Sequence, residues 1–310
     1  MNKKQLALLF SNMLFNFVVA LGLMPFLPLH VTTNLGVDSS QAGIFLSIVS
    51  VALTLGTVIG GWLAEKFKRR KLIMLVGSII GFPSLFLIGF VHELWLVTVL
   101  ATIAWFAIGM STTVGRIITG ILADESERGR IFGIIGAAIP LSSLIGGIIT
   151  GPIVDRWNIP TLFILLSFAF VLQILTVLFM TEIPATDDDK VEKTKHTPEV
   201  GFGMAYWLLA GANLILFVAM STILAARPLR MDQLGFDGTA ISQILIPGAI
   251  ISLPLTFYVG SLSDRVGRKQ MLFLCYLVAT VGMGLLIISE PLWHFGLSEV
   301  CLTFVGISTA

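Results

Sequence analysis

The chain has 310 residues, of which 56% are hydrophobic and 12% charged, and its formal net charge is +1. Soluble domains carry about 25% charged residues, so this chain lacks the polar side chains that would cover a water-soluble globule of its length. Its balanced charge gives no general attraction to nucleic acid. Its two cysteines, both in apolar runs, exclude a disulfide scaffold. The composition therefore indicates an all-α polytopic membrane protein.

Ten apolar stretches follow one another along the chain, and a bilayer-spanning helix needs about 20 such residues. The first stretch is longer than the apolar core of a signal peptide and lacks a cleavage site of small residues. The expected spans are residues 6–29, 41–64, 72–91, 94–122, 131–154, 161–180, 202–226, 239–262 and 271–289, and a tenth that begins at 292.

Basic residues predict the orientation of these spans, because lysine and arginine are enriched in cytoplasmic loops. With the N-terminus in the cytoplasm, 15 of the 19 basic residues fall on the cytoplasmic side and Arg116 falls inside a span. Only Arg156, Arg227 and Arg230 fall on the opposite side. We therefore expect a multi-pass protein of the cell (plasma) membrane with a cytoplasmic N-terminus, in contact with the lipid bilayer.

A polar stretch near residues 182–199 divides the chain, and its mixed charges are typical of a flexible cytoplasmic linker, with a regulatory loop as the alternative. Two patterns recur across it at a spacing of 199 residues. LGVD at 35–38 recurs as LGFD at 234–237, and GWLAEKFKRR at 61–70 recurs as GSLSDRVGRK at 260–269. This spacing predicts a parallel repeat: an N-terminal six-helix bundle (1–183), a linker (184–201) and an incomplete C-terminal bundle of helices 7–10 (202–310).

The second pattern resembles the signature G-x-x-x-D-R-x-G-R-[RK] of the major facilitator superfamily (MFS), which occurs between the second and third helices and again between the eighth and ninth. The copy at 260–269 matches fully, whereas the first copy has Glu65 in place of Asp and Lys68 in place of Gly. Because glycine permits a tight turn, we expect the first loop to have a different shape. The sequence ADESERG at 123–129 is similar to a further loop of the family.

The resemblance implies that these loops form a cytoplasmic latch between two halves that rock about a central cavity. Glycine permits close approach of helices, and the acid can meet the positive end of another helix. The alternative is that the cations only set topology, which we prefer for Lys68, Arg70 and Lys71. The candidate latch residues are Gly61, Glu65, Lys66, Arg69, Gly260, Asp264, Arg265, Gly267 and Arg268.

Two charges lie well inside expected spans, where each costs about 2.5–3.5 kcal/mol on insertion scales. Arg116 is a candidate substrate-binding cation, or it snorkels to the interface. Glu299 is a candidate coupling carboxylate for protons, or a buried structural acid. In the family the first, fourth, seventh and tenth helices line the cavity, which makes Asn12, Asn16 and Asn213 candidate cavity residues. Hydrogen bonds between helices are the equal alternative for these asparagines.

Small residues concentrate on spans expected to meet between the halves, among them Gly56 and Gly60 and the glycines of the fifth span. Small residues four apart allow helix backbones to touch. We expect this packing within one chain rather than between two chains.

These features predict a secondary transporter that works by alternating access and exports hydrophobic or amphipathic small molecules, with protons as the candidate coupling ion. Uptake of a sugar, organic anion or other metabolite is the alternative. A transport-inactive product or membrane sensor is the alternative of another class. No nucleophile–base pair, Walker loop or metal-ligand spacing is present in the sequence, so we expect neither an enzyme nor a cofactor. The repeat spacing would end the second half near residue 382, so we also expect a C-terminally truncated form.

Overall fold

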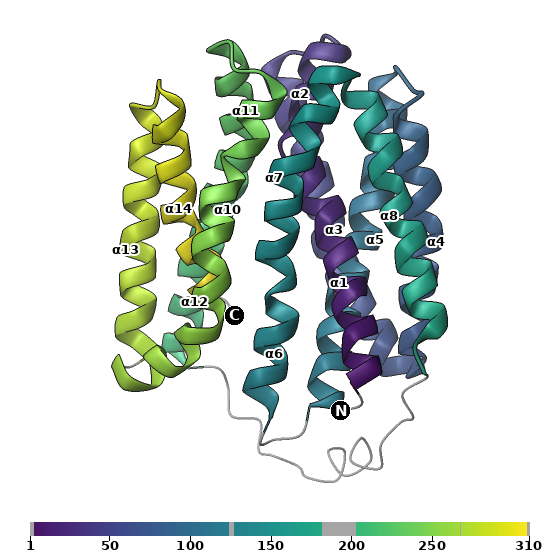
Figure 1. Ribbon diagram of the computed structural model, residues 1–310, viewed down its shortest axis with the longest axis vertical. Coiled ribbons are helices and arrows are strands. Elements are labelled where there is room, and N and C mark those ends of the chain that lie inside the picture. The colour runs from purple at the N-terminus through teal and green to yellow at the C-terminus, as the bar shows by residue number, and fades with distance from the viewer. Residues whose placement is uncertain (1–2, 124–126, 182–202, 267, 309–310) are drawn as a thin grey trace.

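The computed structural model describes residues 3–123, 127–181, 203–266 and 268–308, and shows long helices running side by side with connecting loops at their two ends (Figure 1). The predicted linker at 184–201 lies outside the described residues. The helices before it, which we call the first half, are α1 (Lys3–Leu23), α2 (Phe26–Leu29), the short π-helix η1 (His30–Asn34), α3 (Ser39–Phe67), α4 (Arg70–Ile88), α5 (Leu94–Leu122), α6 (Arg128–Gly136), α7 (Ala138–Arg156) and α8 (Ile159–Phe179).

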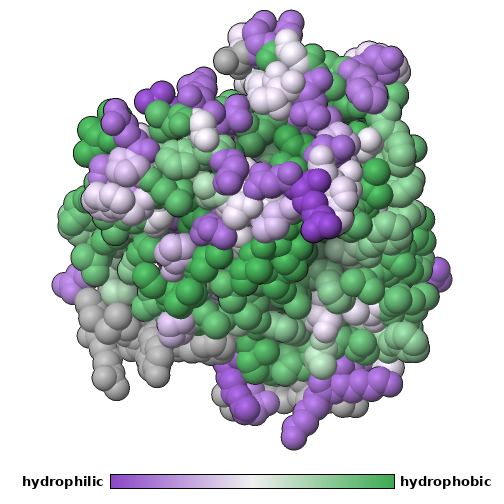
Figure 2. Space-filling view, turned by 45° about the horizontal axis from the view of Figure 1, so that its top comes forward, coloured by the Kyte–Doolittle hydropathy of each residue, from purple (hydrophilic) through white to green (hydrophobic). Residues whose placement is uncertain are grey.

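The helices after residue 202, which we call the second half, are α10 (Met204–Gln233), α11 (Gly238–Gln243), α12 (Leu245–Val266), α13 (Arg268–Ile287) and α14 (Leu292–Ser308). Within the described ranges, eight helical segments are long and apolar enough to cross a membrane. Figure 2 shows the matching surface, a broad apolar band with polar side chains gathered beyond it. The chain is thus an all-α, multi-pass membrane protein.

Two of the differences from the predicted helix boundaries affect residues near the site. The first expected span is interrupted after Leu23, where Pro25 lacks the N–H that would continue the helical hydrogen bonds. The seventh expected span ended at residue 226, but α10 continues to Gln233. Arg227, which was expected in a loop, is therefore a helical residue.

We call the end of the bundle where α1 begins the N-terminal end, and the end with the loops at 35–38, 157–158 and 234–237 the far end. Two far-end loops share one geometry at the predicted spacing of 199 residues. Gly36 and Gly235 have positive φ angles of 66° and 83°. The carboxylates of Asp38 and Asp237 accept hydrogen bonds from backbone N–H groups three residues on, at 2.9 and 2.8 Å. The repeated sequence therefore builds a repeated turn and helix cap.

The first motif loop turns at Lys68, the position that glycine has in the family signature. Lys68 has a φ of 54° and is the one described non-glycine residue with a positive φ. A lysine thus occupies the left-handed position after α3 that a glycine would occupy without strain. Nearby, Lys71 donates hydrogen bonds to the carbonyl oxygens of Leu178 and Met180, at 3.0 and 2.7 Å, where α8 ends. Lys71 therefore caps a helix as well as carrying a topology charge.

The small residues of α3 pack against α5 within the first half. A Cβ added at Gly56 would overlap the backbone of Phe106, and one at Gly60 would lie 2.8 Å from the Cα of Met110. The prediction of packing within one chain is confirmed for this pair. The expectation that Gly56 and Gly60 face the other half is wrong in this structure, because α5 occupies that side of α3.

Buried apolar side chains form two clusters along the bundle. One includes Phe26 and Phe45 from the first half together with Met231, Ile241 and Phe295 from the second. The other, which includes Leu9, Met13, Ala64, Ile73 and Met180, contains first-half residues only. The buried apolar cluster that the two halves share therefore lies toward the far end.

Candidate functional site

A small cavity of about 60 Å³ lies between the two halves, and part of it is open to the surroundings. The turn between α1 and α2 and the helix α7 supply its first-half wall, and α10, α11, α12 and α14 supply the rest. Most of its lining is apolar, including Leu21, Met24, Leu224, Ile241, Ile244 and Leu245. This lining suits the apolar body of a small molecule.

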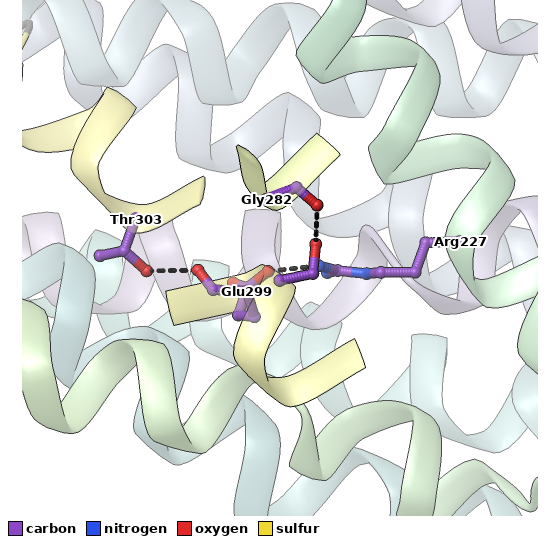
Figure 3. Close-up of polar contacts among 5 residues, drawn as sticks. Arg227, Gly282, Glu299 and Thr303 are labelled. Carbon is purple, nitrogen blue, oxygen red and sulfur yellow. Dashed lines mark hydrogen bonds and ion pairs between the residues drawn. The ribbon is translucent and has the colours of Figure 1, made fainter. Parts of the chain in front are cut away.

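Three polar side chains line the same cavity: Ser143, Arg227 and Glu299. Arg227 of α10 and Glu299 of α14 form an ion pair, joined through Nη1 and Oε2, and their side chains are 4% and 16% exposed (Figure 3). The Nε of Arg227 has no hydrogen-bond partner among the described residues. A buried charge needs its partner, so removal of either member would leave an uncompensated charge.

The neighbours of Glu299 fix its position on α14. The Ser298 hydroxyl donates a hydrogen bond to the Gly282 carbonyl of α13 at 2.7 Å, and the Thr303 hydroxyl donates to the Glu299 carbonyl at 2.8 Å (Figure 3). On α12, Gly248 has no side chain, and a Cβ there would lie 3.0 Å from the Cγ of Glu299. The Glu299 side chain points toward α10, where it pairs with Arg227 and lines the cavity (Figure 3).

The two asparagines of α1 make hydrogen bonds to neighbouring helices. The Asn12 amide donates to the Gln173 carbonyl at 3.2 Å and to the Thr176 hydroxyl at 2.9 Å, both on α8. The Asn16 amide donates to the Ile108 carbonyl and the Thr112 hydroxyl of α5, at 3.3 and 2.9 Å. Both side chains are fully buried and neither lines the cavity, so the described contacts match the alternative role of bonding helices together.

The remaining predicted cavity residues lie apart from this site. Arg116 is exposed on α5, four residues after Thr112 and therefore on the same helix face one turn nearer the N-terminal end. The Asn213 side chain lies outside the described residues. Among the predicted site residues whose side chains are described, Glu299 is thus the one that lines the cavity wall.

The predicted latch residues of the first motif lie at the N-terminal end. Gly61 faces Thr113, with a Cβ position 3.4 Å from its methyl group. Glu65 and Arg69 are exposed, and the Lys66 ammonium lies 4.4 Å from the Trp62 ring centre. The second-motif side chains lie outside the described residues: Gly260, Asp264, Arg265, Gly267 and Arg268. A latch role for both motifs stays a prediction.

Two residues were not singled out from the sequence. Arg227 was counted as a loop cation because the apolar run ends at residue 226 and Pro228 follows, but α10 continues through both residues to Gln233. Asp155 directly follows the expected fifth span; it lies in the last turn of α7, and its carboxylate accepts hydrogen bonds from Gly238 and Thr239 of the second half. The sequence carries no signal for a partner 83 residues away.

Long apolar helices on both sides of a cavity are typical of membrane transport proteins. The family model of the Major Facilitator Superfamily matches residues 8–310, and the chain belongs to this family. It is a transport protein rather than an enzyme.

Known proteins resemble this chain at two levels. The multi-drug resistance efflux pump PmrA of Streptococcus pneumoniae is 26% identical over 277 residues, which cover 85% of this chain and 67% of that protein. Peptide transporter POT is similar in fold. Its complex with sulfate has a TM-score of 0.66 at 14% identity, covering 98% of this chain and 79% of POT. A POT mutant in complex with alafosfalin has a TM-score of 0.68 at 13% identity, covering 98% and 80%.

Proposed function

We propose that this transporter exports hydrophobic or amphipathic small molecules and that protons entering through Glu299 drive the export. The observation that carries the proposal is the cavity between the halves, whose wall is apolar apart from Ser143 and one buried ion pair. The likeness to an efflux pump supports the same direction of transport.

The ion pair supplies a physical means of coupling. In the ion pair each charge compensates the other, and a proton that binds Glu299 removes the negative charge and leaves the guanidinium without its partner. Because a buried, unpaired charge is unfavourable by several kcal/mol, protonation favours an arrangement in which Arg227 reaches water. A proton can therefore shift the equilibrium between conformations, provided that the two conformations differ in their proton affinity.

Inside-out membrane vesicles that contain the protein provide the test, with Hoechst 33342 as an amphipathic dye. An imposed proton gradient is expected to drive dye extrusion, and an ionophore that collapses the gradient should abolish it. Glu299→Gln is expected to lower the gradient-driven rate about tenfold or more, since a neutral amide cannot bind and release a proton. The same variant should retain dye binding.

Glu290→Gln is the matched control, because Glu290 is an exposed carboxylate in the loop before α14. Its extrusion rate should equal that of the unmodified protein. Extrusion that survives collapse of the gradient, or a fully active Glu299→Gln variant, would contradict proton coupling through this residue. Absence of any gradient-dependent flux would favour the transport-inactive alternative.

Uptake of an organic anion is the second candidate, and one observation favours it. Arg227 faces the cavity with an Nε that has no hydrogen-bond partner among the described residues, and a guanidinium binds carboxylates in a bidentate manner. In right-side-out vesicles, this candidate predicts gradient-stimulated accumulation of radiolabelled benzoate that is lost in Arg227→Gln. Dye extrusion without benzoate accumulation would reject it.

A further inference from the structure

We infer that Asp155 is a gating residue: its carboxylate holds the two halves together at the far end, and its release opens the cavity toward that end. The inference concerns how the halves separate and does not depend on which compound is transported. A failure of the dye or benzoate assays would therefore leave it standing.

The Asp155 carboxylate bridges the two halves directly. Its Oδ1 accepts a hydrogen bond from the Gly238 N–H at 2.7 Å, and its Oδ2 accepts one from the Thr239 N–H at 2.8 Å. The Thr239 hydroxyl also donates to Oδ2. One carboxylate of α7 thus binds three donors of the second half, and hydrogen bonds to an ionised acceptor are about twice as strong as neutral ones.

Below this contact, α7 meets α11 and α12 along a seam with little side chain. A Cβ at Gly151 would overlap the Gly238 carbonyl oxygen and the Ser242 hydroxyl. One turn further from the far end, the Ser242 hydroxyl donates to the Gly147 carbonyl at 3.0 Å. Because the backbones of the two helices are in direct contact, a small separation removes much of their van der Waals attraction. We therefore expect the seam to be either closed or open, with few intermediate arrangements.

The cavity wall is continuous with this seam. Ile241 and Ile244 line the cavity and follow Thr239 by two and five residues, and Ser143 lines it from α7. Movement of α11 away from α7 therefore removes part of the wall that separates the cavity from the far end. Because Asp155 is at the end of the seam, its three hydrogen bonds must break before the halves can part there.

The position of Asp155 is opposite to that of the two sequence motifs, which lie at the N-terminal end. By the distribution of basic residues, the far end faces the outside of the cell. Asp155 then closes the outer side of the cavity. Alternating access requires such a contact, since each conformation must be sealed at one end by interactions that the other conformation lacks.

Pulsed electron–electron spin resonance on the reconstituted protein tests the inference. Cys275 and Cys301 are replaced, and spin labels are placed on pairs that cross between the halves. Glu93→Cys with Gln233→Cys reports the far end, and Gly129→Cys with Gln270→Cys reports the N-terminal end; all four native residues are exposed. In Asp155→Asn, an amide NH₂ replaces one acceptor oxygen and faces a donor.

We expect Asp155→Asn to raise the ratio of far-end-open to far-end-closed molecules about tenfold or more, because the substitution removes a charge-assisted hydrogen bond. The N-terminal-end distances should shorten at the same time, a result that a purely structural role would not produce. Asp155→Glu should restore part of the closed population. Asp232→Asn, which alters an exposed carboxylate at the same end, should leave both distances unchanged.

Thr239→Val provides a second, milder test, because it removes only the hydroxyl donor and retains the two backbone donors. It should shift the far-end distances in the same direction by a smaller amount. Far-end distances that stay at their original values in both variants would overturn the inference. So would a widening of both ends together, which would mean that Asp155 stabilises the fold and does not choose between conformations.

Discussion

Lys68 shows how one residue can carry a conformational cost in an otherwise regular helix end. Its left-handed backbone conformation after α3 is unfavourable by about 1–2 kcal/mol for a residue with a Cβ. Lys68→Gly is therefore expected to stabilise the protein by about 1 kcal/mol, after allowance for the greater freedom of glycine in the unfolded chain. The thermal unfolding temperature in detergent should rise.

Lys68→Ala is the control for this prediction. It removes the ammonium group and keeps the Cβ, so the strain should remain and the unfolding temperature should not rise. A rise of the same size in both variants would show that charge, and not backbone conformation, limits stability at this position.

His30 makes the far end of the first half sensitive to acid. The ring is 1% exposed, packs edge-on against Phe163 at 5.1 Å, and has no hydrogen-bond partner among the described residues. Burial, with a smaller repulsion from His92, lowers its pKa from 6.5 to about 4. In the folded protein the ring therefore stays neutral at pH values where the unfolded chain already binds a proton.

The sign of the effect follows from this difference. Between pH 6.5 and 4 the unfolded state binds more protons than the folded state, so stability falls as the pH falls through this window. At pH 5.5 the loss relative to pH 7.5 is about 1 kcal/mol. His30→Leu should lose this part of the pH dependence of the unfolding temperature, whereas His92→Gln should keep most of it. Equal pH profiles for His30→Leu and the unmodified protein would contradict the assignment.

At the scale of the helix, the contact between α7 and α11 depends on the absence of side chains. Gly151→Ala places a methyl group against the backbone of Gly238 and Thr239, which cannot move without separating the helices. We expect destabilisation of about 1–3 kcal/mol, typical of overpacking, measured as a lower unfolding temperature in detergent.

Gly146→Ala, in the same helix, is the matched control. A Cβ there would meet only the Gly22 nitrogen, at 3.9 Å, an ordinary van der Waals distance. This variant should unfold near the temperature of the unmodified protein or above it, because alanine favours helix over glycine by about 1 kcal/mol. Equal destabilisation by both substitutions would point to backbone flexibility of α7 as the cause, and not to its contact with α11.

Some helix positions and lengths could be predicted from the sequence and others could not, for physical reasons. The helices α4, α5 and α8 could be placed to within a few residues, because an apolar run bounded by charge or proline reports the bilayer thickness directly. The length of α10 could not be predicted in this way, because the helix continues past the apolar run. Its last turns include Arg227, whose partner Glu299 is 72 residues away in the sequence. Glu299 could be singled out from the sequence because an isolated charge in an apolar run is energetically unfavourable.

The asparagines of α1 illustrate the opposite limit. Residue type and helical spacing place Asn12 and Asn16 on one face of the helix, but they do not show which neighbouring helix that face contacts. The cavity and a helix–helix contact use the same amide chemistry, and only the packing shows that Asn12 bonds to α8 and Asn16 to α5. Asp155 is similar, because its role depends on how the two halves are docked.

For the whole molecule, the arrangement of contacts gives the two ends different roles. The shared apolar cluster, the Asp155 contact and the α7–α11 seam all join the halves toward the far end. The apolar cluster with Leu9 and Met180 belongs to the first half alone. Which role belongs to which side of the membrane depends on orientation, which rests on the bias of basic residues toward the N-terminal end.

Cysteine labelling in intact cells tests that orientation. With Cys275 and Cys301 replaced, a membrane-impermeant maleimide should react with Glu93→Cys at the far end without permeabilisation. It should react with Gly129→Cys only after permeabilisation, because that residue, open to its surroundings at the N-terminal end, would face the cytoplasm. The reverse pattern would invert the topology. Asp155 would then close the cytoplasmic side, and a proton-driven exporter would have to release Asp155 to load its substrate and not to discharge it.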